Sequence, residues 1–291
     1  MKSKPSLFKR VSNYTVVPSF VAICVCCGGP AFAAVWDGTG SVVTDWNDNG
    51  NWVGDAGTGG SAATVNINSP IATISANIVA TPTDILVGTA TGSNGRVDHT
   101  AGTAQTGNGN WMKIGQNGGT GAYNLANTAG TGGIYTGFAQ GAGSLTATSQ
   151  LRVGGGDSGS GSTGTLNVNT SGTVTVGSEL HVGTQTSTGT LNIDNGAVNV
   201  GNWIYIGNGA VGGSGVTGTL NMSGGTLTKT GGNHFRIGSG AGNGFVTISG
   251  GTVTNNGELQ IGDGAGTHGT LTMSVGTINT GSWVSIGRST G

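Results

Sequence analysis

Gly-Ser-Glu-Leu-His-Val-Gly at residues 177–183, and Gly-Thr-Leu-Asn-Ile-Asp-Asn-Gly-Ala-Val-Asn-Val-Gly at residues 189–201, together decide the fold. The stretch holds three short segments, each with two apolar residues separated by one other residue. This period of two places both apolar side chains on one face of a β-strand, and the Gly, Asn, Asp, Ser and Thr residues between the segments favour turns. The stretch therefore predicts three strands, Glu179–Gly183, Gly189–Ile193 and Gly196–Val200.

A unit of this size cannot fold alone. Its six inward side chains contribute about 1.5–3 kcal/mol each when fully buried, whereas ordering ~24 residues costs roughly 1–2 kcal/mol per residue. It must stack on copies of itself, and the copies are present. The β-branched residue and Gly that end the first strand recur with the glycine at Gly88, Gly115, Gly154, Gly183, Gly207, Gly238, Gly262 and Gly287.

Three short strands per coil are typical of a parallel β-helix. We therefore expect an all-β protein, a right-handed parallel β-helix with three-strand coils of about 24–25 residues. A two-layer sandwich is the alternative, but it would require hairpin spacing between the strands.

The N-terminus has the pattern of a secretory signal. Four basic residues precede the apolar run 16–27, and Ala31-Phe32-Ala33 follows as a cleavage site. We expect residues 1–33 to be a signal peptide and the protein to be exported, to the cell surface, the outer membrane or the extracellular space. All three Cys residues lie in this segment, so we expect no disulfide after it.

Residues 34–56 differ from the repeats. Trp36-Asp37-Gly38 and Trp46-Asn47-Asp48-Asn49-Gly50-Asn51-Trp52 hold three of the six Trp residues. Because the first coil of a β-helix has an open edge, solenoids need an atypical cap. We expect an N-terminal cap with irregular entry coils over residues 34–83 and β-helix repeats over residues 84–291. A sugar-stacking site is the alternative for these aromatic residues.

The charge balance excludes one class of partner. After residue 33 the chain keeps six basic residues against eleven acidic ones, a net charge near −5. Nucleic acid is therefore not an expected partner.

The outward positions of the first strand carry the scarce aromatic and charged residues, whereas those of the second and third strands are mostly Thr and Asn. The first outward position reads Trp111, Gln150, Glu179, Trp203, His234, Glu258 and Trp283, and the second reads Lys113, Arg152, His181, Tyr205, Arg236, Gln260 and Ser285. Aromatic rings beside charged groups suit a sugar, which has an apolar face and a polar edge. The candidate ligand-binding residues are Trp203, Tyr205, His234, Arg236, Glu179 and His181.

Two other functions are weighed against glycan binding. His234 and Glu258 would lie ~4.8 Å apart on neighbouring strands, which suits acid–base catalysis by a polysaccharide-acting enzyme; a solvated cross-strand pair is the simpler interpretation, and we expect no enzyme, cofactor or metal. Regular outward Thr pairs resemble those of ice-binding β-helices, although Ala197 and Asn199 interrupt them.

The exported signal, the Trp-rich opening and the repeated Ile-Gly…Gly-Thr-Leu…Gly-Gly-Thr-Val pattern resemble bacterial autotransporter-type passengers and related Gly-rich surface β-helix proteins. The resemblance implies a structural or adhesive role, with a surface glycan or a host or neighbouring cell surface as partner. In that family a C-terminal outer-membrane barrel follows the passenger. Because the sequence stops at Gly291, either the repeat region is truncated and the barrel is missing, or the chain departs from this family. We expect the last strands to fray or to self-associate edge to edge.

Overall fold

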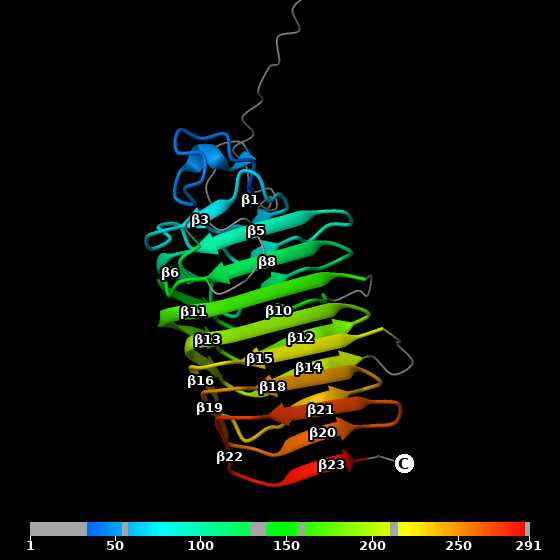
Figure 1. The fold of residues 1–291 in the computed structure, drawn as a ribbon. Helices are drawn as coiled ribbons and strands as arrows, with labels where there is room; N and C mark the ends of the chain where they lie inside the picture. The colour runs from blue at the N-terminus through cyan, green and yellow to red at the C-terminus, as the bar shows by residue number, and fades with distance from the viewer. Residues whose placement is uncertain (1–33, 54–57, 129–137, 157–160, 210–214, 289–291) are drawn as a thin grey trace, which may run out of the picture. The chain divides into compact units, whose positions relative to one another are not determined.

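Parallel strands stack coil upon coil, from β1 at the blue end to β23 at the red end (Figure 1). The computed structural model describes residues 34–53, 58–128, 138–156, 161–209 and 215–288, which all belong to one unit, residues 31–291. The cap region holds a 3-10 turn, η1 (Asn49–Asn51). The expected parallel β-helix is confirmed. The predicted signal peptide, residues 1–33, lies outside the described residues.

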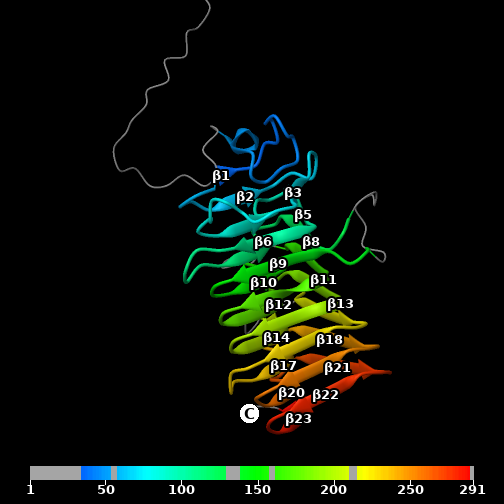
Figure 2. The same ribbon diagram turned by 90° about the vertical axis from the view of Figure 1, so that its left-hand side faces the viewer.

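The first face of the solenoid is a ten-stranded parallel sheet. In Figure 2 its labelled strands β10, β12, β14, β17, β20 and β23 lie one above another. Its strands, in spatial order, are β1 (Ala34–Val35), β2 (Ala63–Val65), β4 (Ile85–Val87), β7 (Met112–Ile114), β10 (Leu151–Val153), β12 (Glu179–Gln185), β14 (Trp203–Gly209), β17 (Phe235–Ser239), β20 (Leu259–Asp263) and β23 (Val284–Arg288).

The second and third faces share a thirteen-stranded sheet. The second face holds β3 (Ala72–Ile74), β5 (Asn94–His99), β8 (Thr120–Leu125), β11 (Thr163–Val176), β13 (Thr188–Val200), β15 (Thr217–Met222), β18 (Asn243–Ile248) and β21 (His268–Met273). The third face holds β6 (Ala101–Gln105), β9 (Ala142–Ala147), β16 (Thr226–Lys229), β19 (Thr252–Asn255) and β22 (Thr277–Thr280).

The prediction of separate second and third strands is wrong for β11 and β13. Each runs without a break from the second face onto the third. The pairing between them shifts register after Val168 and again between Asn169 and Thr173. The predicted turn is therefore a corner within one strand, where an irregularity bends the strand without ending its hydrogen bonding.

The repeated glycine follows three of the first strands directly and lies within the last few residues of the other five, and it has a conformational role. All eight of these glycines have a positive φ, between 65° and 75°, where side chains with a Cβ are strained. At Gly183, whose φ is 72°, an added Cβ would lie 2.2 Å from the carbonyl oxygen of Thr217 in the next coil. This motif therefore places each corner at the same point of its coil.

The core consists of apolar ladders that run along the solenoid axis. Leu151, Leu180, Ile204, Phe235 and Leu259 are paired in register on successive strands of the first face. The residues expected to point inward are buried, namely Leu180, Leu191, Ile204, Leu220, Ile237 and Leu259. Ile261 is half-buried and packs against the same core.

The N-terminal aromatic residues form a cap. Trp36, Trp46 and Trp52 are buried, and Trp52 makes edge-to-face contacts with both of the others, at centroid distances of 5.2 and 4.8 Å. Burial of all three rings agrees with the predicted cap. The alternative sugar-stacking site is wrong, because it requires an accessible ring face.

An outward row of Asn side chains on the second face forms a hydrogen-bond ladder. Each side-chain NH2 donates to the amide oxygen of the Asn on the preceding coil. Asn221 donates to Asn192 (2.9 Å), Asn192 to Asn167 (2.7 Å) and Asn167 to Asn124 (2.7 Å). Asn124 then donates to Asp98 (2.8 Å), a carboxylate that also accepts two hydrogen bonds from Arg96. The ladder thus ends on the buried ion pair of Arg96 and Asp98. The sequence had shown only that the outward positions of this face are mostly Thr and Asn.

Candidate functional site

The candidate site is the row of outward side chains on the first face from β7 to β23, here called the strand-one strip. Each of its strands contributes two outward positions separated by one inward residue, because side chains alternate along a strand. The strip consists of Trp111, Lys113, Gln150, Arg152, Glu179, His181, Trp203, Tyr205, His234, Arg236, Glu258, Gln260, Trp283 and Ser285, with Asp263 and Arg288 beside its C-terminal end.

The structure brings all six predicted site residues together on β12, β14 and β17. The rings of Trp203 and Tyr205 stack at a centroid distance of 5.3 Å and an interplanar angle of 8°. His181, on the preceding coil, stacks on Tyr205 with the two ring centroids 4.8 Å apart. Its Nε2 lies 2.9 Å from Oε2 of Glu179. The six residues form one connected surface, because parallel in-register coils place equivalent positions ~4.8 Å apart.

The following coil completes the cluster around Trp203. His234 makes an edge-to-face contact with its ring at 5.1 Å. The guanidinium of Arg236 lies over the rings of both Trp203 (5.2 Å) and Tyr205 (5.9 Å). Part of the aromatic surface is therefore covered by a cation, and a ligand would meet ring edges and charged groups together.

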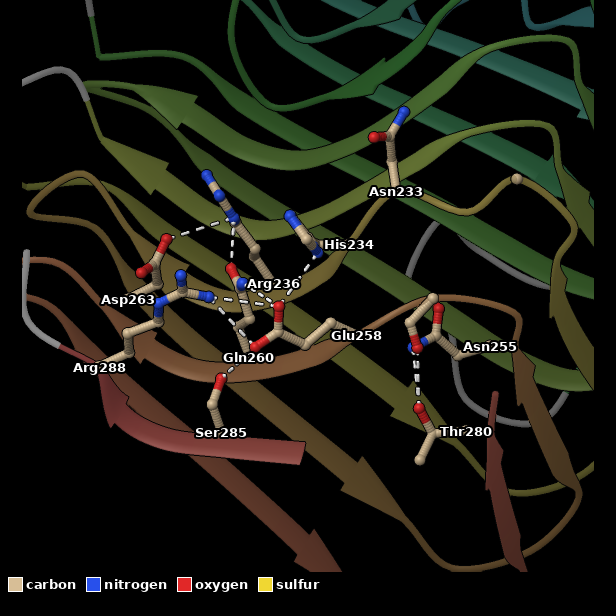
Figure 3. A network of polar contacts seen from close by, with 12 residues as sticks. Asn233, His234, Arg236, Asn255, Glu258, Gln260, Asp263, Thr280, Ser285 and Arg288 are labelled. Atoms are coloured by element: carbon tan, nitrogen blue, oxygen red, sulfur yellow. Dashed lines mark hydrogen bonds and ion pairs between the residues drawn. The ribbon is translucent and has the colours of Figure 1, made fainter. Parts of the chain in front are cut away.

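A second cluster surrounds Glu258 at the C-terminal end of the strip (Figure 3). Glu258 accepts hydrogen bonds from Gln260 (2.9 Å) and Ser285 (2.9 Å) and pairs with Arg288 (3.2 Å). Arg236 links this cluster to the Trp203 cluster, since its Nε lies 2.7 Å from Oε1 of Gln260.

The N-terminal end of the strip is built from Trp111 and two cations. Lys113 Nζ lies 4.6 Å and the guanidinium carbon of Arg152 lies 4.4 Å from the ring centroid of Trp111. Arg152 donates to Gln150 (3.1 Å), which donates to Glu179 (3.1 Å). The sequence places Trp111, Lys113, Gln150 and Arg152 on this face, but of the residues in this group only Glu179 was a predicted site residue.

The titratable groups of the strip respond to these contacts. The hydrogen bond from His181 lowers the pKa of Glu179, and burial opposes the shift. Burial, with a smaller effect of Arg236, lowers the pKa of His234. The Nδ1 of His234 lies 3.5 Å from Oε2 of Glu258 but makes no hydrogen bond to it.

The strip also holds most of the cations that follow residue 33. Of these six Lys and Arg residues, four lie on or beside the strip: Lys113, Arg152, Arg236 and Arg288. The other two, Arg96 and Lys229, are buried, and so is Lys113 of the strip, whereas Arg152 and Arg236 are half-buried and Arg288 is exposed. The most exposed Lys and Arg side chains after residue 33 therefore lie on or beside the strip.

Two of the Thr rows are interrupted in the structure. On the second face Phe245, which is 41% exposed, stands in register between Thr219 and Thr270. On the third face Ala197 pairs with Thr173 and Thr226. These interruptions make the Thr rows a poorer match to a regular ice-binding array than the sequence pattern alone.

The described residues hold neither a metal-binding cluster nor a membrane-spanning helix. No group of three or more His, Cys, Asp and Glu side chains there could hold a metal ion. Among the same residues, no helix has the length and apolar character needed to cross a membrane.

The fold and the strip define this chain as a parallel β-solenoid protein with an aromatic and charged strip along one face. No protein-family model, curated protein or solved structure matches the chain.

Proposed function

We propose that this chain is an exported bacterial surface β-solenoid with a structural or adhesive role, which binds glycan through the strand-one strip. The observation that carries the proposal is the concentration of aromatic and cationic side chains on this single face. Export is proposed from the basic, apolar and Ala-x-Ala pattern of residues 1–33.

The chemistry of the strip fits a sugar better than an apolar ligand. Trp203 and Tyr205 are half-exposed and lie beside His234 and Arg236, which carry hydrogen-bonding groups. A sugar ring offers C–H groups to an aromatic surface and hydroxyl groups to charged side chains. Extended repeat surfaces also provide the long binding sites that solenoid proteins use.

The test is binding of the purified chain to a glycan array and to bacterial and host cells. We expect the double substitution Trp203→Ser and Tyr205→Ser to weaken binding strongly. The matched control is Thr252→Ala with Thr254→Ala, which changes two outward residues of the third face and should leave binding unchanged. Circular dichroism and thermal melting establish that both variants remain folded.

Two outcomes contradict the proposal. One is a wild-type chain that binds no glycan and no cell surface. The other is a folded Trp203→Ser, Tyr205→Ser variant that binds as tightly as the wild type. Either result would leave the strip with a purely structural role, in which its rings and ion pairs cover the first sheet.

A further inference from the structure

The side-chain chemistry of the strand-one strip repeats every third coil. At the first outward position Trp occurs on the coils of β7, β14 and β23, and Glu occurs on those of β12 and β20. At the second outward position Arg occurs on β10 and β17. The strip therefore contains a first module, Trp111, Arg152 and Glu179, and a second module, Trp203, Arg236 and Glu258, and Trp283 stands where a third would begin.

The contacts within the modules repeat as well. The Arg of each module lies over the Trp of the coil before it, at 4.4 Å for Arg152 and Trp111 and at 5.2 Å for Arg236 and Trp203. In each module the carboxylate accepts a hydrogen bond from the second outward residue of its own strand. The distance is 2.9 Å for both His181 to Glu179 and Gln260 to Glu258.

The preceding coil also contacts each carboxylate, through a hydrogen bond in the first module and through a longer contact in the second. Gln150 lies 3.1 Å from Glu179, and His234 lies 3.5 Å from Glu258. The Trp–Arg contact and the carboxylate with its own-strand hydrogen bond thus occur twice, with different neighbouring residues. The coil packing requires only apolar inward residues and corner glycines, so it does not account for a three-coil period on the outward face.

The modules are separated by three coil steps of ~4.8 Å, or about 14 Å. From β7 to β23 the strip is about 29 Å long, whereas its two outward positions span only about 7 Å. This narrow strip has a projected area of about 200 Å². A stable protein partner requires about 800 Å² on each side, so the shape of the strip fits a linear chain better than a globular partner.

We infer that the ligand of the strip is a linear polysaccharide that lies along the solenoid axis and contacts both modules at once. Its chemical repeat, or a small multiple of it, matches the spacing of about 14 Å between modules. Each module offers the same indole edge, guanidinium and carboxylate to successive repeats. This inference rests on the proposed glycan binding and adds to it the shape, direction and repeat of the ligand.

The experiment measures the affinity of the full chain for size-graded oligomers of cellulose, chitin and alginate. The series begins at disaccharides and extends to chains long enough to pass both modules. Two contacts on one ligand convert the second binding event into an intramolecular one. We expect the affinity to rise by at least about tenfold once the oligomer spans both modules.

Matched variants separate the modules. Trp111→Ser with Arg152→Gln removes the first module, and Trp203→Ser with Arg236→Gln removes the second. Each should abolish the affinity step for long oligomers and keep the wild-type affinity for short ones. The combination of all four substitutions should remove both the affinity step for long oligomers and the binding of short ones. Circular dichroism verifies that each variant is folded.

The outcomes distinguish this inference from the proposal on which it rests. If oligomers bind but affinity does not change with their length, or if one module variant abolishes all binding, glycan binding stands and the two-module ligand is wrong. If no glycan binds, both are wrong. If sedimentation instead shows an oligomer that the four substitutions dissociate, the partner of the strip is a second copy of this chain.

Discussion

Arg236 lies over the indole ring of Trp203, with its guanidinium carbon 5.2 Å from the ring centroid. The same Arg pairs with Asp263 at 3.3 Å, so it holds together three successive coils of the first face. The strip is consequently part of the scaffold as well as a surface, and changes in it should affect stability and ligand binding together.

Replacing Arg236 by Ala should lower the free energy of unfolding by about 1 kcal/mol, because a cation–π contact contributes about 0.5–1 kcal/mol at exposed sites and one ion pair is lost. Urea unfolding measures the change. Arg288→Ala is the control: its side chain is 49% exposed in the pair with Glu258, and exposed pairs contribute little. Equal effects of the two substitutions would show that the Trp203 contact adds no stability.

The Asn ladder should be most sensitive at its buried middle. Asn167 is buried and both donates and accepts within the ladder, so Asn167→Ala leaves an amide oxygen of Asn124 and an amide N–H of Asn192 without their partners. We expect a loss of about 1–3 kcal/mol in the free energy of unfolding. Asn221→Ala, at the exposed end, should cost only a few tenths of a kcal/mol. A cost at Asn221 equal to that at Asn167 would contradict the ladder.

His99 should make the protein sensitive to acid. Its Nε2 lies 3.1 Å from the Gly102 carbonyl oxygen and donates to it, so Nδ1 accepts from the Tyr123 hydroxyl at 2.9 Å. Burial lowers the pKa of His99 from 6.5 to about 4. Between these values the unfolded chain binds more protons, so the free energy of unfolding falls as the pH is lowered, by up to about 1.4 kcal/mol per pH unit.

Urea unfolding from pH 7 to pH 4 checks the His99 prediction. Tyr123→Phe keeps the imidazole and should keep this part of the pH dependence. His99→Leu combined with Tyr123→Phe removes the titrating group and the hydroxyl that it would leave unpaired. If the free energy of unfolding changes with pH equally in the double variant and in Tyr123→Phe, His99 does not titrate in this range.

Lys229 should make the protein more stable in alkali. It is fully buried at an inward position of β16, and its Nζ donates to the carbonyl oxygens of Gly231 and Asn233. Burial lowers its pKa from 10.5 to about 8. Between these values the unfolded chain binds the extra proton, so the free energy of unfolding should rise with pH by up to about 1.4 kcal/mol per unit.

The comparison for Lys229 is Lys229→Met, which keeps much of the side-chain volume and removes the amine. Urea unfolding from pH 7.5 to pH 10.5 should show the rise for the wild-type chain and a smaller one for the variant. If the free energy of unfolding of the wild type and of Lys229→Met changes equally with pH, the buried amine keeps its ordinary pKa, for example because water reaches it.

The last coil should behave as an open edge. Strands β21, β22 and β23 each pair with one neighbouring strand only, and Trp283 and Ile286 are 79% and 77% exposed. Unpaired strand edges attract other strands. For the 291-residue chain we expect fast amide exchange in β23, or self-association that protects it. A monomer with strong protection in β23 would show that the edge is covered.

The strands and the core were predictable because they depend on local patterns. Alternating apolar residues such as Leu180 and Val182 identify an inward pair, and Gly183 identifies the corner because its φ of 72° excludes most other residues. The six predicted site residues also follow from counting alternate positions. The binding role of these residues stays a prediction.

The local sequence pattern could not predict that β11 and β13 are continuous strands. Asn169 lies at the corner between the second and third faces, and Asn also favours turns. Whether the chain breaks its hydrogen bonding there depends on the neighbouring coil, which supplies the partner groups.

The sequence by itself determined which residues point inward, where each coil turns and which face carries the aromatic and charged side chains, because period two and corner glycines act within a few residues. Only the tertiary structure decided that Arg236 covers Trp203, that the Asn ladder ends on Asp98 and that His99 and Lys229 are buried with partners. Those relationships join residues from different coils or depend on burial. Stacking sets the register between coils and excludes water, and both determine side-chain contacts and pKa values.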